Sequence, residues 1–469
     1  MVRHPLIWIT TATLALTGYA AAQESVSTQY ADGGIYEGTL KDGKQHGMGT
    51  YTLPNGYRYE GEWVAGEIRG NGTARFPDGS VYEGQFAAGK PDGEGRMSFA
   101  DGSVYEGQWR EGVIEGTGVA TYPNGMRYEG AFRQAQRHGE GRLETPDGYI
   151  YEGAWQDGAK TGTATITYAD GSVYTGDVTE GLRDGQGRLE APDGLIYEGG
   201  WQAGERTGEG TLTMPTGNVF TGSFVNGLRQ GPGRMEYANG DVFEGNFEDD
   251  LRNGDGTFSR PDGYRYAGMW QAGRMAGQGS LTYPDGAVYE GEFAEDLPEG
   301  TGSVTYPDGS SYAGAWAGGQ IEGQGRAEYA NGAVYEGGFV AAKRSGQGTL
   351  TLPDGSTYEG EWANGLRSGD GTARYTDGTV YEGDFAEDLR DGLGKITYPD
   401  GSSYEGEWVQ GRIEGEGRAT YANGDVYEGQ FVDGQRDGQG TLRYASGEVE
   451  TGIWLDGFLG EITEPAGVN

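Results

Sequence analysis

Polar and apolar residues alternate along most of the chain in a pattern that predicts β-strands. In the segment YEGEW, which ends at Trp408, aromatic residues and glycine alternate with two glutamates. In the segment GRATY, which ends at Tyr421, glycine, alanine and tyrosine alternate with arginine and threonine. A period of two is typical of strands, because their successive side chains point to opposite faces of a sheet. We therefore expect one face with aromatic rings and glycine, and another with carboxylates.

The pattern recurs every 23 residues without insertion or deletion. Eighteen copies begin at an aromatic anchor, from Tyr36 to Tyr427, and a degenerate nineteenth copy has Glu450 at the anchor position. Position n denotes the residue that lies n places after the anchor. Glycine stands at positions 2, 11 and 20 of all eighteen copies, and at position 13 of all but one, where Ala164 replaces it. Two glycine-bearing segments, such as VQGRIEG and PDG, separate two strands per repeat; the second suits a type I turn with a left-handed glycine.

This motif resembles the MORN repeat, whose pattern is close to YEGxWxxGxxxGxGxxxxxDGxxYxG. The resemblance implies an all-β fold, an elongated single-layer antiparallel sheet of stacked β-hairpins that forms a solenoid-like rod. We divide the chain into a signal peptide (1–22), a polar leader (23–35), eighteen repeats (36–449), and a degenerate repeat with a C-terminal cap (450–469). Each hairpin of such an array contacts mainly its neighbours.

Position 4 alternates between tryptophan and phenylalanine in most repeats. Position 15 is alanine after several of the tryptophans and larger after the phenylalanines, so we expect positions 4 and 15 to lie opposite each other and compensate in volume. In the same register, the glycine at position 2 lies opposite the aromatic residue at position 17. The alternation makes a 46-residue dyad, which slips once between Trp201 and Trp270. We expect a seam near residues 202–269, either a bend or the scar of a duplication.

The first residues differ from the rest. A short basic start is followed by an apolar run and by three alanines that end at Ala22. This order is typical of a secretory signal peptide, and we expect cleavage after Ala22. A membrane anchor is the alternative, but the apolar run is short and contains several threonines. We therefore expect an exported protein of the periplasm, the cell envelope or the extracellular space.

Composition narrows the possible functions. The chain has no cysteine, which excludes disulfides and thiolate metal sites, and its 94 glycines follow the repeat. The formal net charge of −38 disfavours binding to nucleic acid and to anionic lipid surfaces, which need clustered lysine and arginine. The charge suits cations or a basic partner.

A ladder of carboxylates is the candidate interaction surface. Glutamate directly follows the anchor in most repeats, which would place one carboxylate per repeat on the polar face of the sheet. The alternative is that this face is simply a solvated surface. The candidate residues are Glu60, Glu83, Glu106, Glu359, Glu382, Glu405 and Glu428.

No enzyme chemistry is expected. His46 and His138 both stand at position 10, where other repeats have unrelated residues, so we interpret them as ordinary repeat positions. The acidic turns Glu248-Asp249-Asp250, Glu295-Asp296 and Glu387-Asp388 are weak candidates for calcium, which needs several oxygen ligands. Glycine-rich phosphate loops are not expected, because none of these segments opens a helix. We expect no cofactor and no catalytic or metal-binding residue.

The leading hypothesis is an exported, non-enzymatic scaffold that presents an extended acidic β surface to an unknown protein partner, for which the charge favours a basic one, or that associates with itself as a homodimer. The alternative is binding of membrane lipid headgroups or of cell-envelope glycans. The charge weighs against lipid, and the rings are expected to be committed to packing. An exposed row of aromatic residues would favour the glycan.

Overall fold

Stacked antiparallel hairpins make up the whole described part of the protein. The computed structural model describes residues 25–462, and the signal peptide expected at 1–22 lies outside this range. Strands β1 to β39 occur between residues 25 and 462, with no helix among them. Each repeat contributes a seven-residue strand and a nine-residue strand, for example β34 (Ser403–Val409) and β35 (Arg412–Thr420). The expected all-β fold of stacked hairpins in a single antiparallel layer is confirmed.

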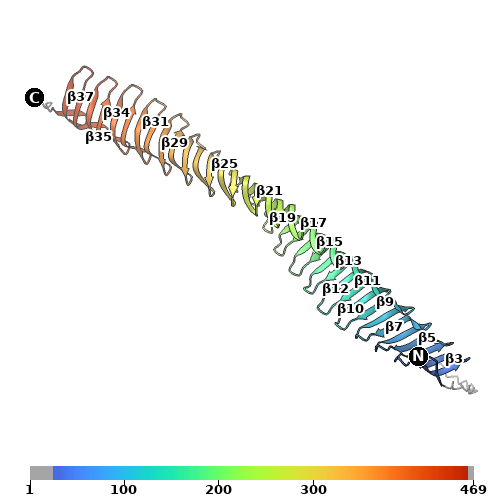
Figure 1. Cartoon of the computed structure of the whole chain (residues 1–469). Coiled ribbons are helices and arrows are strands. Elements are labelled where there is room, and N and C mark those ends of the chain that lie inside the picture. Colours follow the sequence, from blue (N-terminus) through green and yellow to red (C-terminus); the bar gives the residue numbers. More distant parts are fainter. Residues whose placement is uncertain (1–24, 463–469) are drawn as a thin grey trace, which may run out of the picture. The chain divides into compact units, whose positions relative to one another are not determined.

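The chain divides into two units, the first ending at Thr207 and the second beginning at Gly208. In the first unit, consecutive strands pair antiparallel in chain order, as Figure 1 shows for the blue and cyan strands. The strands of this unit are β1 (Val26–Gln29), β2 (Ile35–Lys41), β3 (Lys44–Thr52), β4 (Arg58–Val64), β5 (Glu67–Arg75), β6 (Val81–Ala87), β7 (Lys90–Ser98), β8 (Val104–Arg110), β9 (Val113–Thr121), β10 (Arg127–Arg133), β11 (Gln136–Glu144), β12 (Ile150–Gln156), β13 (Ala159–Thr167), β14 (Val173–Thr179), β15 (Leu182–Glu190) and β16 (Ile196–Gln202).

Strand β17 (Glu205–Thr213) contains the unit boundary, which falls inside residues 202–269, where the tryptophan–phenylalanine alternation slips. The second unit continues with the same consecutive antiparallel pairing. Its further strands are β18 (Val219–Val225), β19 (Leu228–Glu236), β20 (Val242–Glu248), β21 (Leu251–Ser259), β22 (Arg265–Gln271), β23 (Arg274–Thr282), β24 (Val288–Ala294), β25 (Leu297–Thr305), β26 (Ser311–Ala317), β27 (Gln320–Glu328), β28 (Val334–Val340), β29 (Lys343–Thr351), β30 (Thr357–Ala363), β31 (Leu366–Arg374), β32 (Val380–Ala386), β33 (Leu389–Thr397), β36 (Val426–Val432), β37 (Gln435–Arg443), β38 (Val449–Leu455) and β39 (Phe458–Ile462).

The polar leader and the degenerate last copy both contain strands. In the leader, β1 pairs with β2, and Thr28 lies opposite the first anchor, Tyr36. Thr28 thus takes the place that the residue at position 15 of a full repeat has opposite the next anchor. At the other end, β38 pairs with β39 through Trp454 and Leu459. Residues 463–469 of the proposed cap lie outside the described range.

The register of the hairpin differs from our expectation. In β34 and β35 the anchor Tyr404 pairs with Ala419 at position 15, and Gly406 pairs with a second glycine at position 13. Trp408 at position 4 pairs with Ile413 at position 9. The predicted pairing of position 4 with 15, and of position 2 with 17, is therefore wrong.

The turn and a bulge explain this difference. Gln410 and Gly411 both have positive φ, 48° and 83°, which is the signature of a two-residue type I′ turn. This turn closes the hairpin directly after Val409, nearer to the anchor than the centre we assumed. The register then shifts between Gly406 and Trp408, where three residues of β35 face one residue of β34. At the other end of each strand pair, the PDG-type turn has the expected left-handed glycine, with Gly401 at φ 87°.

Two rows of glycine let the anchor ring lie flat against the sheet. A Cβ atom on Gly406 would sit 2.5 Å from both the Oη of Tyr404 and the Cα of Gly417. The Tyr404 hydroxyl donates a hydrogen bond to the carbonyl oxygen of Glu407 (3.0 Å), so the ring is fixed at both ends. All eighteen anchors are buried. The periodic glycines therefore make room for the core of a single-layer sheet, which has no second layer to pack against.

The rings at positions 0 and 4 form an edge-to-face row within each unit, which Val178 interrupts in the first unit. Trp408 lies 5.6 Å from its own anchor Tyr404 and 5.3 Å from the preceding anchor Tyr381, with nearly perpendicular planes. Its indole N–H donates to the carbonyl oxygen of Gly394 (3.2 Å), a bond that phenylalanine cannot make.

The predicted volume compensation between positions 4 and 15 of the same repeat is also wrong, because these two residues do not lie opposite each other. Position 15 pairs with anchors on both sides, as Ala419 does with Tyr404 and Tyr427. The ring at position 4 instead leans toward position 15 of the preceding repeat: Trp270 lies 6.4 Å from Phe258. Every tryptophan at position 4 thus follows a repeat with a large residue at position 15, and every alanine at position 15 is followed by a phenylalanine. Phe224, Phe247 and Phe293 follow large residues instead.

Candidate functional site

The carboxylate ladder lies on the face of the sheet opposite to the rings. All seven candidate glutamates are exposed and follow a buried anchor. In register, each pairs with position 14 of its own repeat and of the preceding one, as Glu428 does with Thr441 and Arg418. The structure therefore aligns 60, 83 and 106 in the first unit and 359, 382, 405 and 428 in the second, about 10 Å apart, two strand spacings.

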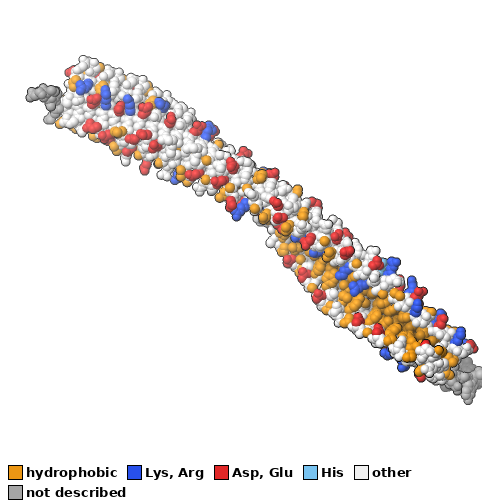
Figure 2. Space-filling view, viewed as in Figure 1, with side chains coloured by type: hydrophobic (Ala, Val, Ile, Leu, Met, Phe, Trp, Pro, Cys, Tyr) orange, Lys and Arg blue, Asp and Glu red, His pale blue; other side chains and the backbone are white. Residues whose placement is uncertain are grey.

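The ladder is not a bare row of negative charge. Position 14 carries arginine or lysine in several repeats, and Glu405 lies 3.4 Å from Lys395, while Glu428 lies 3.4 Å from Arg418. Arg188 contacts Glu190 at 2.7 Å and Glu198 at 3.1 Å. Such exposed pairs add little stability, but they neutralise part of the face. Figure 2 shows acidic and basic side chains mixed on the visible surface of each unit.

Four members of the ladder keep an open carboxylate. Glu83, Glu106, Glu359 and Glu382 make no ion pair with any residue between 25 and 462. Glu83 and Glu60 line one shallow hollow in the first unit, floored by glycine backbone. Glu359 lines a similar hollow in the second unit, together with residues that include Arg326 and Gln347. The ladder thus faces shallow grooves, not an enclosed cleft.

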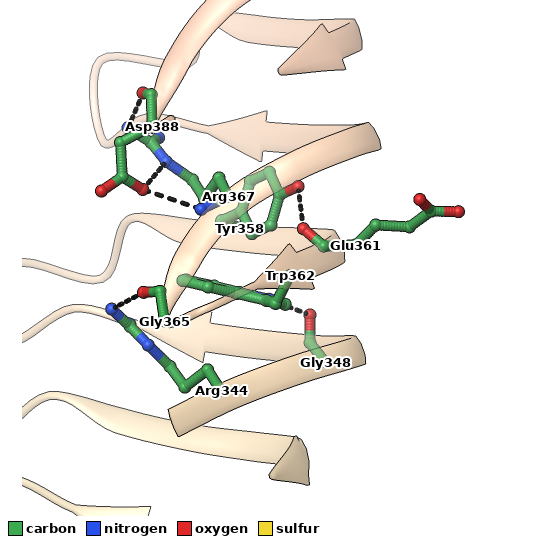
Figure 3. Close-up of polar contacts among 8 residues, drawn as sticks. All are labelled: Arg344, Gly348, Tyr358, Glu361, Trp362, Gly365, Arg367 and Asp388. Atoms are coloured by element: carbon green, nitrogen blue, oxygen red, sulfur yellow. Dashed lines mark hydrogen bonds and ion pairs between the residues drawn. The ribbon is translucent and has the colours of Figure 1, made fainter. Parts of the chain in front are cut away.

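The acidic turns have a structural role. Asp388 stands at position 7 with φ 68°, where most repeats have glycine, and its Oδ1 accepts bonds from the backbone N–H (2.9 Å) and the Nε (3.2 Å) of Arg367. Figure 3 shows this clamp. Asp250 binds Arg229 in the same way, and Asp296 accepts from the backbone N–H of Met275. Among the described residues no group of three or more side chains suits a metal ion.

His46 takes a role that acidic residues have in other repeats, whereas His138 does not. The Nδ1 of His46 accepts a bond from the backbone N–H of Ala65 (3.4 Å), at position 6 of the next repeat. Asp391 does the same for Gln410 at 3.0 Å. The Nδ1 of His138 lies 3.6 Å from the carboxylate of Asp157, at position 6 of the next repeat, and makes no hydrogen bond with any described residue. The side chains of His46 and Asp391 thus brace the next type I′ turn.

A cationic residue at position 9 connects many repeats through the rings. Arg344 donates to the carbonyl oxygen of Gly365 (2.7 Å), and its guanidinium carbon lies 4.0 Å from the centre of the Trp362 ring (Figure 3). Trp362 in turn donates to Gly348 (3.1 Å). Lys160 occupies the same position, 2.8 Å from the Tyr149 hydroxyl, and burial lowers its pKa to about 8. These residues hold adjacent repeats together, which leaves few cations free on this face.

Sequence reasoning missed a row of half-exposed aromatic side chains. Position 17 lies just before the PDG-type turns, at one edge of the sheet, and in the second unit it is tyrosine in most repeats. Our wrong register placed these rings over glycine. Six consecutive members are 36–40% exposed: Tyr306, Tyr329, Leu352, Tyr375, Tyr398 and Tyr421.

Comparison with known families agrees with this geometry. The family model described as MORN repeat matches eighteen consecutive segments, the first covering residues 36–56 and the last 427–449. The chain belongs to the MORN-repeat family. Its anchors, glycine rows and rings at position 4 are therefore the MORN pattern, repeated along nearly the whole described chain.

Other comparisons add little about this MORN protein. No curated protein matches it. The SAS-4 TCP domain of Drosophila melanogaster, solved with a proline-rich motif of Ana2, is 17% identical and covers 46% of this chain and 99% of that one, with a TM-score of 0.21. The wild-type TCP10 domain of Danio rerio CPAP is 14% identical, with 66% and 96% covered and a TM-score of 0.11. A search of residues 25–462 finds no helix suited to crossing a membrane.

Proposed function

We propose that this MORN-repeat protein is an exported, non-enzymatic scaffold that binds a protein partner, or a second copy of itself, along its repeated surface. The observation that supports it is the commitment of the chemistry-bearing side chains to contacts between repeats. Rings, arginines, turn acids and His46 all contact neighbouring hairpins, as Trp362, Arg344 and Asp388 illustrate. The side chains that make no contact between repeats form an exposed surface that recurs once per repeat, and this surface is available to a partner.

The open carboxylates are the part of the ladder that suits a basic partner. Glu83, Glu106, Glu359 and Glu382 form no ion pair in the described part of the chain, so binding a lysine or arginine would not require breaking one. Arg96 is the cross-strand neighbour of Glu83 and Glu106, and Lys395 is that of Glu382, but neither cation is in ion-pair contact with these carboxylates. A repeated weak contact of this kind gains affinity through multivalency.

The test is affinity capture with a variant in which these four glutamates are changed to glutamine. We expect the variant to lose at least about tenfold in retention of the native partner, because four charge-assisted contacts are weakened. The matched control changes four turn acids at position 6: Asp42→Asn, Glu111→Gln, Glu180→Gln and Glu387→Gln. Asparagine and glutamine stand there naturally at Asn226 and Gln410, with the same positive φ. Equal losses in both variants would show that only net charge matters, and no loss in either would remove the ladder from the proposal.

Lipid headgroups and envelope glycans are the alternative ligands. The buried rings at positions 0 and 4 are not available for sugars, whereas the half-exposed row at position 17 is the surface that a glycan would use. Vesicles of neutral and anionic lipid, and soluble oligosaccharides, test these ligands directly. Binding of anionic vesicles at physiological salt, despite a net charge of −38, would favour the lipid.

A further inference from the structure

The tyrosine row at position 17 is an exposed apolar surface with a fixed period. Between Tyr306 and Tyr421 every repeat contributes one side chain that is 36–40% exposed. The hydroxyls of Tyr306, Tyr329 and Tyr398 make no hydrogen bond with any other described residue, so they are available as donors and acceptors. In the first unit, the same position holds a mixture of apolar, aromatic and polar residues, none of which is among the exposed large apolar side chains.

Carboxylates accompany these rings in four of the six turns, and asparagine stands in the other two. Position 19 of the same turns is aspartate or asparagine, and its side chain accepts a bond from the backbone N–H of position 21, as Asp400 does from Ser402 (2.9 Å). The Ser402 hydroxyl and N–H lower the pKa of Asp400, and Asp308 and Asp377 are held in the same way. These acids are therefore charged and fixed in direction next to the tyrosines. The row suits a ligand with apolar patches and positive charges.

The repeat spacing matches one kind of peptide. Two strands at ~4.8 Å each place successive tyrosines about 9.6 Å apart along the sheet. A polyproline II helix advances ~3.1 Å per residue with three residues per turn, so it repeats about every 9.3 Å. Such a helix would present one proline face to each tyrosine, and the small difference accumulates to less than about 2 Å over six repeats. Because the helix has no internal hydrogen bonds, it can follow the twist of the sheet.

We propose that the tyrosine row of residues 306–421 binds a proline-rich, basic segment of a partner protein in the polyproline II conformation. Prolines pack against the rings, tyrosine hydroxyls donate to the peptide carbonyls, and lysine or arginine at every third residue faces the carboxylates at position 19. The inference rests on the proposed protein-binding function but uses an edge of the sheet that the carboxylate ladder does not reach.

Titration of the full chain with the synthetic peptide (Pro-Pro-Arg)6 tests this site. We expect binding that weakens about tenfold or more for (Gly-Ser-Arg)6, which has the same charge but is a flexible coil. The variant Tyr329→Ala/Tyr375→Ala/Tyr398→Ala should weaken binding of (Pro-Pro-Arg)6 by a similar factor. Its matched control, Leu366→Ala/Leu389→Ala/Val409→Ala, removes side chains of comparable exposure, 39%, 46% and 45%, at the other edge of the sheet and should bind as wild type.

A second variant tests the carboxylates without disturbing the turns. Asp354→Asn/Asp377→Asn/Asp400→Asn keeps the turn bond, because Asn331 and Asn423 already accept it in their own repeats. We expect about a threefold or greater loss of affinity and a weaker dependence on salt. Circular dichroism and thermal unfolding of each variant show that the fold is intact.

Several results would overturn the inference. Equal binding of both peptides, unchanged binding by the tyrosine variant, or no binding at all would each do so. Tyrosine-dependent binding of cellohexaose or chitohexaose, with none of the peptide, would assign the row to a glycan instead. If the native partner is still captured by the tyrosine variant, the scaffold proposal stands while this inference fails.

Discussion

Close packing of two glycines and one ring is the basic unit of this protein at the residue scale. The chain itself offers a comparison between the two glycine rows, because Ala164 stands at position 13 of one repeat while no full repeat has a side chain at position 2. At position 2 an added Cβ meets backbone of the neighbouring strand, which cannot move away. At position 13 it meets mainly the anchor ring, which can shift.

We predict that Gly360→Ala costs about 2–3 kcal/mol of unfolding free energy and Gly371→Ala about 1 kcal/mol or less. A Cβ at Gly360 would lie 2.5 Å from the Cα of Gly371 and 2.6 Å from the carbonyl oxygen of Asp370, whereas one at Gly371 would meet atoms of the Tyr358 ring. Urea unfolding of both variants gives the difference. Equal costs would show that the ring is as rigid as the backbone.

The aspartate at position 7 gives a second comparison at this scale. We predict that Asp388→Ala destabilises the protein by about 2 kcal/mol, because it loses the bonds to Arg367 and keeps an unfavourable positive φ. Asp388→Gly should cost less, since glycine adopts this φ freely and stands there in most repeats. Glu387→Gln, one residue earlier, should be nearly neutral. Thermal unfolding ranks the three, and a larger loss for glycine than for alanine would contradict the clamp.

At the scale of the hairpin, local pattern and non-local register differ in how far the sequence reveals them. The period, the two strands per repeat and the outward glutamates all follow from alternation and glycine spacing, which are local. The register depends on where the turn lies, and VQGRIEG contains several candidate centres. Asn364-Gly365 and Asp157-Gly158 were the available signals for a two-residue turn. The cations beside Glu405 and Glu428, and the tyrosine row, could not be placed without that register.

The corrected neighbours predict how hairpins can be removed. Deleting the dyad 358–403 leaves Trp408 after a repeat with a large residue, Leu350, at position 15, as in the native chain. We therefore expect little change in the stability of the remaining repeats. Deleting only 381–403 would bring Trp408 beside Ala373 in place of Ile396 and leave a small void, with an expected cost of about 1–2 kcal/mol more. Urea unfolding with matched protein concentrations measures both. If the variant lacking 381–403 proves more stable than the variant lacking 358–403, then the residue at position 15 of the preceding repeat does not stabilise the ring at position 4.

At the scale of the whole molecule, the buried anchors link stability to alkaline pH. Burial raises the pKa of Tyr358, Tyr404 and Tyr427 from the ordinary 10.0 to about 12. A raised folded pKa means that the stabilisation is complete below pH about 10 and is lost as the pH rises toward 12, because the unfolded chain ionises first. We expect tyrosinate absorbance to rise and strand circular dichroism to fall together in that range. Ionisation of the buried anchors well before unfolding would contradict their burial.

The turns that contain position 19 also affect how the protein undergoes deamidation. Asn-Gly is the dipeptide most open to deamidation, because glycine offers no steric protection to the attacking backbone nitrogen. At Asn423 that nitrogen, on Gly424, is already hydrogen-bonded to Tyr421 (2.9 Å), which holds it away from the side chain. Where deamidation yields ordinary aspartate, the product is the residue that Asp400 already supplies in the same bond one repeat earlier. Deamidation to ordinary aspartate would therefore exchange one native version of the turn for another and add negative charge at the edge where the tyrosines lie, whereas isoaspartate, the other product of the succinimide, would lengthen the turn backbone by one carbon.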